Sequence, residues 1–301
     1  MKQRCAVGVD VGGTKIAAEL VDLVTGKSLA TQSVATAAQD GGQAVLDRVA
    51  KLVQDLRSKA RALDQTPVGV GIGLPELVTC EGQVASAWNF DWRGIDLGIG
   101  LGLDLPLMVD SDVRCGALGE QRFGAAQTYA TFSYVSIGTG ISAVQCIDRH
   151  IHRGANGFAI HFGSTDLMPV GVDGPKAFNL EAFASGAGLS TVYAARTGIA
   201  GVTARDMIEG RAGPAGLELM DHSTTALASF LGQMINMIDP EALIIGGGLG
   251  TSAPYLRQLQ AKIPSYVWAE TCRGIPILSS ALGPRAGAVG AACLLGQGQA
   301  G

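Results

Sequence analysis

The feature that most constrains the fold of this chain is a short unit that occurs twice. In each copy an apolar strand ends in a glycine-rich turn, and a second strand follows at once. The first copy is expected to use strands at 5–10 and 16–21, and the second copy strands at 134–137 and 141–147. A repeated strand-turn-strand unit, with helical segments after each copy, indicates a duplicated α/β domain.

The remaining hydrophobic pattern predicts further strands and helices. Apolar residues recur at helical spacing over 41–63 with charged residues opposite them, which indicates an amphipathic helix. Further strands are expected at 28–34, 68–74, 105–109 and 242–245. Further helices are expected at 117–123, 180–196, 203–210, 223–238, 252–268 and 286–295.

Length and composition agree with a globular protein of two domains. A chain of 301 residues suits two domains, since single hydrophobic cores stop growing at roughly 250 to 300 residues. Hydrophobic residues make up 47% and charged residues 16%, which is enough apolar material for a core. We expect a smaller N-terminal domain of residues 1–113 plus 286–301 and a larger domain of residues 114–285.

Charge and hydropathy exclude several classes of function. The net charge of −4 gives no electrostatic reason to expect nucleic acid or an acidic membrane surface as a partner. No apolar stretch approaches the roughly 20 residues that span a bilayer, and Asp10 interrupts the apolar N-terminal run too early for a signal peptide. The six cysteines are scattered, which favours reduced thiols. We therefore expect a cytoplasmic protein that binds neither nucleic acid nor membrane.

The first glycine-rich turn carries residue types that bind a phosphate group and its metal ion. Two glycines let backbone N–H groups face an anion, and Asp10 can hold Mg²⁺ directly or through water. The residues expected to contact a nucleotide here are Asp10, Gly12, Gly13, Thr14 and Lys15. The alternative is an ordinary hairpin turn, in which Asp and Gly are also common.

Two further glycine-rich turns follow apolar strands in the second half of the chain. They are formed by Gly138, Thr139 and Gly140 and by Gly246, Gly247 and Gly248. With the first turn they suggest a clamp on a polyphosphate and a backbone surface for a flat ring. Their alternatives are a plain hairpin and a turn that begins a helix. The usual phosphate-binding loop, G-x-x-x-x-G-K-[ST], is absent from the sequence.

A set of short motifs spans nearly the whole chain in a fixed order. The motifs are Asp10-Val-Gly-Gly-Thr-Lys15, Gly71-Ile-Gly-Leu-Pro75, Asn89-Phe-Asp-Trp92, Gly138-Thr-Gly140, Arg153-Gly-Ala-Asn-Gly157, Leu180-Glu181 and Gly246-Gly-Gly248. In this order they resemble the repressor/open-reading-frame/kinase (ROK) sugar kinases, which include bacterial glucokinases. The resemblance implies an actin-like (RNase H-like) α/β fold of two domains, with ATP and Mg²⁺ in the interdomain cleft. It also implies γ-phosphoryl transfer to a primary hydroxyl of a hexose-like substrate, in a homodimer or homo-oligomer.

The catalytic base that the resemblance implies is Asp112. The family has a Glu-Asn-Asp run after a strand, and here Asp110, Ser111 and Asp112 occupy that place. Phosphoryl transfer needs a carboxylate within hydrogen-bond reach of the attacking hydroxyl, which agrees with this placement. The alternative is that these three residues only cap the helix that follows them.

Several of the implied substrate contacts depart from the family pattern. The Asn before the base is Ser111 here, the sugar-facing Glu is His161, and the zinc-binding His is Ser164. The family's cysteine-rich zinc loop is replaced by 172–179, which contains no cysteine, so we expect no zinc site. The expected substrate contacts are Asn89, Ser111, Asp112, Asn156, His161 and Glu181.

These departures bear on the substrate. A carboxylate accepts two hydroxyl hydrogen bonds, whereas a neutral imidazole accepts one and donates one. We expect the accepting primary hydroxyl to be retained and the far end of the substrate to differ from glucose, as in an amino sugar, a ketose or, preferably, a C7-cyclitol. The alternative for His161 is a core or interface residue.

Two other functions stay open. One is an ordinary glucokinase or hexose 6-kinase. The other is a non-catalytic sugar sensor or structural paralogue, although the first strand begins at residue 5 and leaves no room before it for a DNA-binding module. The sequence also leaves open whether the phosphoryl donor is ATP, another nucleotide or polyphosphate.

Overall fold

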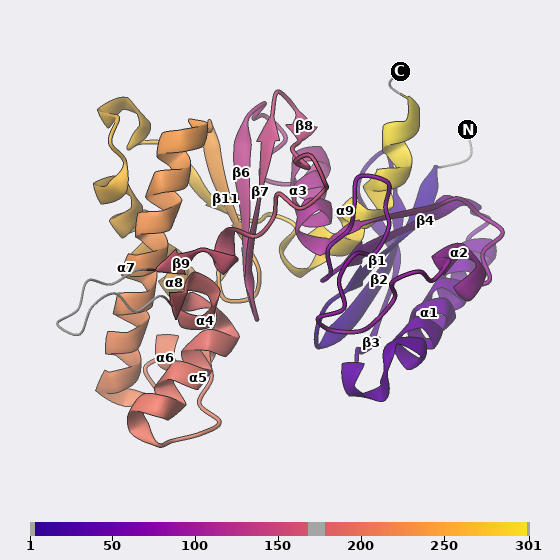
Figure 1. Ribbon diagram of the computed structural model, residues 1–301. Helices are drawn as coiled ribbons and strands as arrows, with labels where there is room; N and C mark the ends of the chain where they lie inside the picture. The colour runs from indigo at the N-terminus through magenta and orange to yellow at the C-terminus, as the bar shows by residue number, and fades with distance from the viewer. Residues whose placement is uncertain (1–3, 168–177, 300–301) are drawn as a thin grey trace. The chain divides into compact units, whose positions relative to one another are not determined.

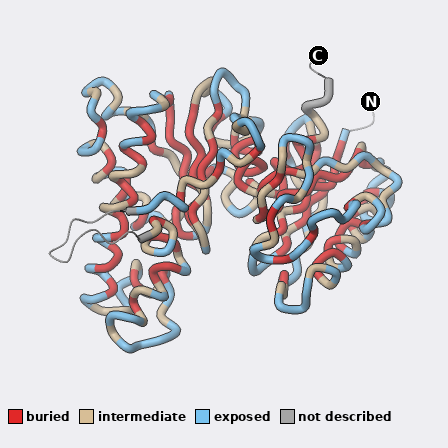
Figure 2. Tube along the Cα trace, viewed as in Figure 1, coloured by how far each residue is buried: buried red, intermediate tan, exposed pale blue. Residues whose placement is uncertain are grey.

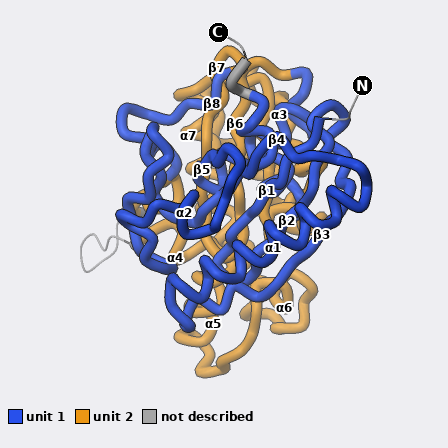
Figure 3. Tube along the Cα trace, turned by 90° about the vertical axis from the view of Figure 1, so that its right-hand side faces the viewer, with its two compact units in different colours: residues 1–128, 150–160, 284–301 blue, residues 129–149, 161–283 orange. Residues whose placement is uncertain are grey.

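The computed structural model describes residues 4–167 and 178–299. The chain forms two compact units, which Figures 1 and 3 show. Unit 1 comprises residues 1–128, 150–160 and 284–301, and unit 2 comprises residues 129–149 and 161–283. The chain therefore enters and leaves each unit more than once.

Unit 1 is built on a mixed five-stranded sheet of order β3-β2-β1-β4-β5. Strands β1, β2 and β3 are antiparallel neighbours, whereas β4 and β5 run parallel to β1. The strands are β1 (Cys5–Val11), β2 (Lys15–Asp22), β3 (Ser28–Ala35), β4 (Pro67–Leu74) and β5 (Leu107–Ser111). The central strands β1 and β4 are almost fully buried (Figure 2), as expected for strands covered on both faces.

Helices cover both faces of this sheet. Alternate residues of β1, among them Val7 and Val9, belong to one apolar cluster with the buried face of α1 (Gly42–Ala62). Gly8, which lies between them, faces α9 (Ala286–Cys293) instead. Since neighbouring side chains of a strand point to opposite faces, α1 and α9 lie on opposite sides of the sheet (Figure 1). The helix predicted over 41–63 is confirmed as α1.

Glycines allow α9 to lie directly on the sheet and on α3 (Asp112–Phe123). A Cβ at Gly8 would lie 1.9 Å from the carbonyl oxygen of Ala288, and one at Gly71 would lie 1.8 Å from that of Ala291. A Cβ at Gly290 of α9 would lie 1.6 Å from the carbonyl oxygen of Cys115 in α3. Because of this packing, the compact units divide the chain at other positions than the predicted domains of 1–113 plus 286–301 and 114–285. The predicted domain boundaries stay a prediction.

Unit 2 contains a second mixed sheet, in which four strands follow the order β12-β11-β6-β7. Strands β6 and β7 are antiparallel, and β11 is parallel to both β6 and β12. The strands are β6 (Phe132–Ile137), β7 (Ile141–Ile147), β11 (Ala242–Gly246) and β12 (Ile277–Ser279). Its helices are α4 (Leu180–Ala184), α5 (Gly186–Thr197), α6 (Ala204–Ile208), α7 (Gly213–Ile238) and α8 (Ala253–Lys262).

Three helices of unit 2 differ from the sequence prediction in their bounds. The helix predicted at 223–238 begins at Gly213, because Pro214 stands in the first turn, where a missing N–H is tolerated. The helix predicted at 180–196 is divided at Ser185, whose extended backbone and side chain cap α5. The helix predicted at 252–268 ends at Lys262, since Pro264 lies just beyond it in a 3₁₀ turn.

Short elements complete the described chain. They are α2 (Leu97–Gly100), β8 (His150–Ile151), the pair β9 (Asp166–Leu167) and β10 (Phe178–Asn179), and 3₁₀ turns η1 (Ala38–Asp40), η2 (Phe162–Ser164), η3 (Ile263–Tyr266), η4 (Glu270–Cys272), η5 (Gly283–Arg285) and η6 (Leu294–Gln299). Within residues 4–167 and 178–299, no helix has the length and hydropathy needed to cross a membrane.

Candidate active site

The first glycine-rich turn joins β1 to β2 in unit 1. The N–H of Gly12 donates to the carbonyl of Lys15 at 2.9 Å, so this amide is engaged within the hairpin. The hydroxyl of Thr36 donates to the carbonyl of Gly12 at 2.6 Å, and its N–H donates to that of Thr14 at 3.0 Å. Gly13, Thr14 and Lys15 are exposed. Thr36 therefore holds the turn by hydrogen bonds to its carbonyl groups, while the residues at its tip stay exposed.

Asp10 lies at the end of β1, against the first turn of α9. A Cβ at Gly287 would lie 2.5 Å from Oδ2 of Asp10, so only glycine leaves room for this carboxylate. Burial and the neighbouring charge of Asp112 raise the pKa of Asp10 to about 7, against an opposite effect of Lys15. A divalent cation bound beside Asp10 would compensate the negative charges of the Asp10 and Asp112 carboxylates.

Asp112 is the first residue of α3 and follows directly after β5. Burial raises the pKa of Asp112 to about 6. The N–H of Val113, which donates to Oδ1 of Asp112 at 2.7 Å, and the charge of Arg114 act in the opposite direction. Since β1, β4 and β5 are parallel, their carboxyl ends meet at one edge of the sheet. Asp10 and Asp112 both lie at this edge.

Ser111 and Asp110 have structural partners. Ser111 is fully buried and caps α3, its hydroxyl accepting from the N–H of Arg114 at 3.4 Å. The Asp110 carboxylate is buried and forms ion pairs with Arg114, at 2.5 Å, and with Arg153. The capping interpretation of this run therefore describes Ser111, whereas Asp112 is partly exposed.

The segment that carries Asn156 is held by the same two arginines. Arg114 donates to the carbonyls of Gly157, at 2.5 Å, and Val78, at 3.0 Å. Arg153 donates to the carbonyl of Cys80 at 3.3 Å. Asn156 lies between these anchors and is exposed.

Glu76 is a residue at this edge of the sheet that the sequence analysis missed. It follows Pro75 at the end of β4, is only 2% exposed, and accepts hydrogen bonds from the segment 86–90. Asn89 belongs to that segment and is exposed next to the β1–β2 turn, where a Cβ at Gly13 would lie 3.4 Å from its Oδ1. The signal in the sequence that could have identified it is a charged residue two positions after the apolar strand β4.

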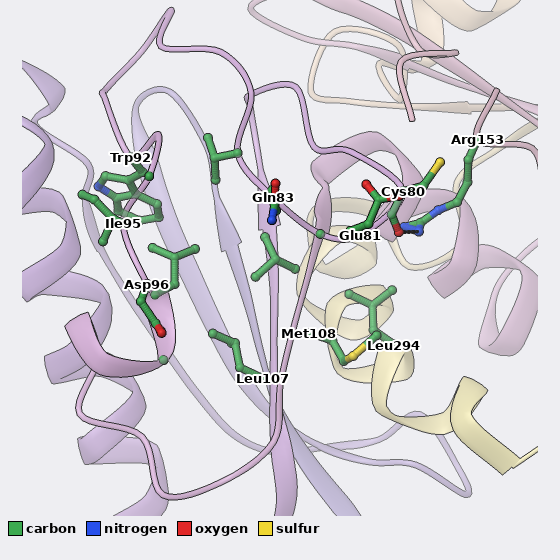
Figure 4. Close-up of a pocket in the computed structure, with 16 residues that line it drawn as sticks. Cys80, Glu81, Gln83, Trp92, Ile95, Asp96, Leu107, Met108, Arg153 and Leu294 are labelled. Carbon is green, nitrogen blue, oxygen red and sulfur yellow. Dashed lines mark hydrogen bonds between the residues drawn. The ribbon is translucent and has the colours of Figure 1, made fainter. Parts of the chain in front are cut away.

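Unit 1 also contains a pocket of about 680 Å³, which Figure 4 shows. It lies between the edge strand β5, represented by Met108, and the segments 80–84 and 92–98. Arg153 borders it, beside Cys80 and Glu81 (Figure 4). None of the predicted site residues is among its lining residues.

Two glycine-rich turns lie side by side in unit 2. The β6–β7 turn is closed by the N–H of Gly138, which donates to the carbonyl of Gly140 at 2.9 Å. The turn after β11 passes close to β6, because Gly247 has a φ of +79° and a Cβ there would lie 2.4 Å from the carbonyl oxygen of Ile137. A Cβ at Gly138 would lie 3.9 Å from the N of Gly248. The structure thus brings the two predicted turns together.

Glu181 contacts the β6–β7 turn. Its Oε2 accepts from the N–H of Ile141 at 2.6 Å, and a Cβ at Gly140 would lie 2.5 Å from the same oxygen. Burial lowers the pKa of His161, while the charge of Glu181 acts in the opposite direction. Burial thus favours the neutral imidazole of His161, which lies close enough to Glu181 for their charges to interact.

The segment 172–179, which replaces the family's zinc loop, falls mainly outside the described residues. Positions 172–177 are not described, while Phe178 and Asn179 form β10. In the part of the chain that the structure does describe, no group of three or more His, Cys, Asp or Glu side chains is placed to hold a metal ion.

Comparison with known proteins identifies relatives over nearly the full length. The model of the ROK family matches residues 6–297. A glucokinase of Halalkalibacterium halodurans is 27% identical over 322 residues, covering 99% of this chain and 96% of the relative. A glucokinase of Streptomyces coelicolor is 30% identical over 314 residues, covering 96% of each chain.

A solved structure agrees with these sequence matches. The ROK family glucokinase from Streptomyces griseus, determined in complex with glucose and AMPPNP, is 28% identical to this chain. It superposes with a TM-score of 0.81 and covers 98% of this chain and 100% of its own. The predicted actin-like α/β fold is confirmed by this likeness. With matches that span almost all of its residues, the chain belongs to the ROK family.

Proposed function

We propose that the protein is a sugar kinase that transfers the γ-phosphoryl group of ATP to a primary hydroxyl of a hexose-like substrate. The observation that carries the proposal is the pair of carboxylates at one edge of the unit 1 sheet. Asp112 and Asp10 have pKa values raised to about 6 and about 7. A base is most effective when its pKa lies near the working pH.

In this proposal Asp112 acts as the general base. Its carboxylate takes the proton of the substrate hydroxyl while the hydroxyl oxygen forms a bond to the γ-phosphorus. The bond between that phosphorus and the β–γ bridging oxygen breaks, and ADP leaves. Because α3 begins at Asp112, the carboxylate is held on a rigid element rather than on a loop.

The nucleotide contacts are assigned to the glycine-rich turns of each unit. In unit 1 they are Asp10, Gly12, Gly13, Thr14 and Lys15, and in unit 2 Gly138, Thr139, Gly140, Gly246, Gly247 and Gly248. At Gly140 a Cβ would collide with the carboxylate of Glu181, and at Gly247 with the backbone of Ile137, so both turns need glycine to keep this shape. Asp10 is the assigned holder of Mg²⁺, which would neutralise phosphate charge when bound. The glucokinase from Streptomyces griseus, solved with AMPPNP, supports ATP as the donor.

The substrate contacts are assigned to Asn89, Asn156 and Asp112 in unit 1 and to His161 and Glu181 in unit 2. The glucokinases among the relatives support a hexose-like substrate. The replacement of an acidic residue by His161 supports a substrate other than glucose, since a neutral imidazole cannot accept two hydroxyl hydrogen bonds. The C7-cyclitol stays a prediction from the sequence, for none of the relatives named above is a cyclitol kinase.

The test is a coupled assay of ADP release with Mg·ATP over hexoses, amino sugars, ketoses and C7-cyclitols. Turnover of one non-glucose compound, with poor turnover of glucose, is the expected result. Strong turnover of glucose would support an ordinary glucokinase and contradict the argument from His161. If calorimetry shows sugar binding but no compound causes ADP release, the kinase proposal is contradicted. That result would favour a non-catalytic sugar sensor, in agreement with the word repressor in the name of the family.

A further inference from the structure

The segment 86–90 is held to the end of β4 by a single carboxylate. The Oε2 atom of Glu76 accepts from the hydroxyl of Ser86 and, at 2.9 Å, from the N–H of Trp88. Its Oε1 atom accepts from the N–H groups of Asn89, at 2.6 Å, and Phe90, at 3.4 Å. A buried carboxylate is tolerated when donors of this kind surround it, and it then rigidifies the groups that donate to it.

The same carboxylate fixes which way the Asn89 amide points. Its Nδ2 donates to the carbonyl of Pro75 at 3.0 Å and to Oε1 of Glu76 at 3.3 Å. The reverse orientation would place the amide oxygen against two acceptors, so the hydrogen-bond network excludes it. Oδ1 is therefore the atom that faces away from Glu76, beside the exposed Gly13.

We propose that Glu76 is a positioning residue that holds Asn89 with its Oδ1 outward, so that the site selects a substrate carrying a hydrogen-bond donor at that point. The donor would be a sugar hydroxyl or ammonium group. This proposal rests on the proposed function, because it takes Asn89 as a substrate contact. A site with a fixed acceptor discriminates against an analogue that lacks the donor, since the acceptor is then left unpaired.

A second effect of Glu76 reaches the proposed base. The charge of Glu76 is among the causes that raise the pKa of Asp112, behind burial. The N–H of Val113 and the charge of Arg114 act in the opposite direction, and Asp10 of β1 faces the same edge.

The experiment compares Glu76→Gln, Asn89→Ala and the double variant in the full-length protein. The probes are glucose, mannose and glucosamine with their monodeoxy and monofluoro analogues, assayed for kcat and KM with Mg·ATP. We expect each single variant to raise KM about 3- to 10-fold, with a smaller change in kcat, the usual contribution of one hydrogen bond. We also expect one analogue to be discriminated by the wild type and no longer by Asn89→Ala. In the double variant Glu76→Gln should have no further effect on KM, because it acts through Asn89.

Glu120→Gln is the matched control. Glu120 is also fully buried and accepts a backbone N–H, that of Ala125, at 2.6 Å. We expect Glu120→Gln to lower the melting temperature but to leave KM and analogue discrimination unchanged. If Glu76→Gln behaves like this control, or if its effect on KM adds to that of Asn89→Ala, the proposal is wrong.

Failure of this inference differs from failure of the proposed function. A wild type that phosphorylates a sugar while Glu76→Gln keeps its KM and its discrimination between analogues overturns the inference alone. A wild type without turnover on any compound overturns the kinase. Calorimetric Kd values for the same sugars and variants then decide whether Glu76 positions Asn89.

Discussion

The glycine-rich turns of the two units occupy equivalent places and are fastened in different ways. Val11 pairs with Ile16 across the first turn, whereas Ile137 pairs with Ile141 across the second, so the first turn is one residue longer. Thr36 holds the carbonyls of the first turn. The first amides of α5 hold those of the second, with Gly186 N–H donating to the carbonyl of Gly138 at 2.8 Å.

The charged groups differ as well. Asp10 lies two residues before the glycines of the first turn, and Ser136 has the corresponding place before the second. The second turn instead has Glu181 bound to the N–H of Ile141 from another element. The comparison shows that the same strand-turn-strand unit can differ in where its charged and supporting residues come from. In unit 1 it carries an acidic residue of its own, and in unit 2 it provides a neutral backbone surface held from outside.

The largest expected effect concerns the acidic edge of unit 1. We expect Asp112→Asn to lower kcat about 10²- to 10⁴-fold, the usual contribution of a general base, while ATP binding by calorimetry is unchanged. Asp104→Asn is the control, since Asp104 is an exposed carboxylate with an arginine partner. Unchanged turnover in Asp112→Asn would show that the base lies elsewhere.

The next effect is on the pH dependence. Because Asp112 must be ionised to act as a base, kcat/KM should fall about tenfold per pH unit below pH 6. Stability should change in the opposite sense. The folded-state pKa values of Asp10 and Asp112 lie above the ordinary value of 3.8, so their ionisation favours the unfolded state. Their contribution to stability is present below pH 4 and is lost as the pH rises towards 7.

The stability of the Asp10→Asn, Asp112→Asn double variant provides the measurement. Denaturant unfolding at several pH values should show that the wild type loses stability relative to the double variant between about pH 4 and 7. The pKa values of Asp91 and Asp206 are lowered to about 2, so their contributions change only below this window. A constant difference between the two proteins would contradict the prediction.

A matched pair of substitutions tests the two turns directly. A Cβ at Gly140 would lie 2.5 Å from Oε2 of Glu181, whereas one at Gly13 would lie 3.4 Å from Oδ1 of Asn89. We expect Gly140→Ala to destabilise the protein by about 1–3 kcal/mol and Gly13→Ala by about 0.5 kcal/mol or less. Denaturant unfolding measures both, and equal effects would show that the turns tolerate a side chain equally.

The last effect concerns the hydrogen bond from the Thr36 hydroxyl to the first turn. Thr36→Val removes the hydroxyl that donates to Gly12 and should cost about 1 kcal/mol. Thr31→Val on the neighbouring strand is the control, because Thr31 is exposed. A melting temperature equal to that of the control would mean that the turn keeps its shape without Thr36.

The sequence predicted what depends on local pattern. The apolar spacing over 41–63 marked α1 almost to the residue, since each turn of a long amphipathic helix repeats the same signal. Both hairpins were predicted from apolar runs around glycines. The predicted start of α7 was late, because Gly213 and Pro214 signal a break as well as a first turn.

What could not be predicted depends on contacts between distant residues. Nothing near Gly290 in the chain reveals that it meets Cys115, and so the packing of α9 against α3 could not be predicted. Glu76 was missed for the same reason, since its partners lie 10 to 14 positions further on. Ser111 was expected to contact the substrate, with a helix cap as the alternative, and only the fold shows that its hydroxyl accepts from the N–H of Arg114. The substrate contact stays a prediction.

The position of α9 in the chain has a consequence for synthesis. One face of the unit 1 sheet is covered by residues 286–293, which the ribosome adds after all of unit 2. Until then the strands made first keep an uncovered face, a state in which nascent chains attract chaperones and one another. Unit 1 begins its translation first and completes its fold last.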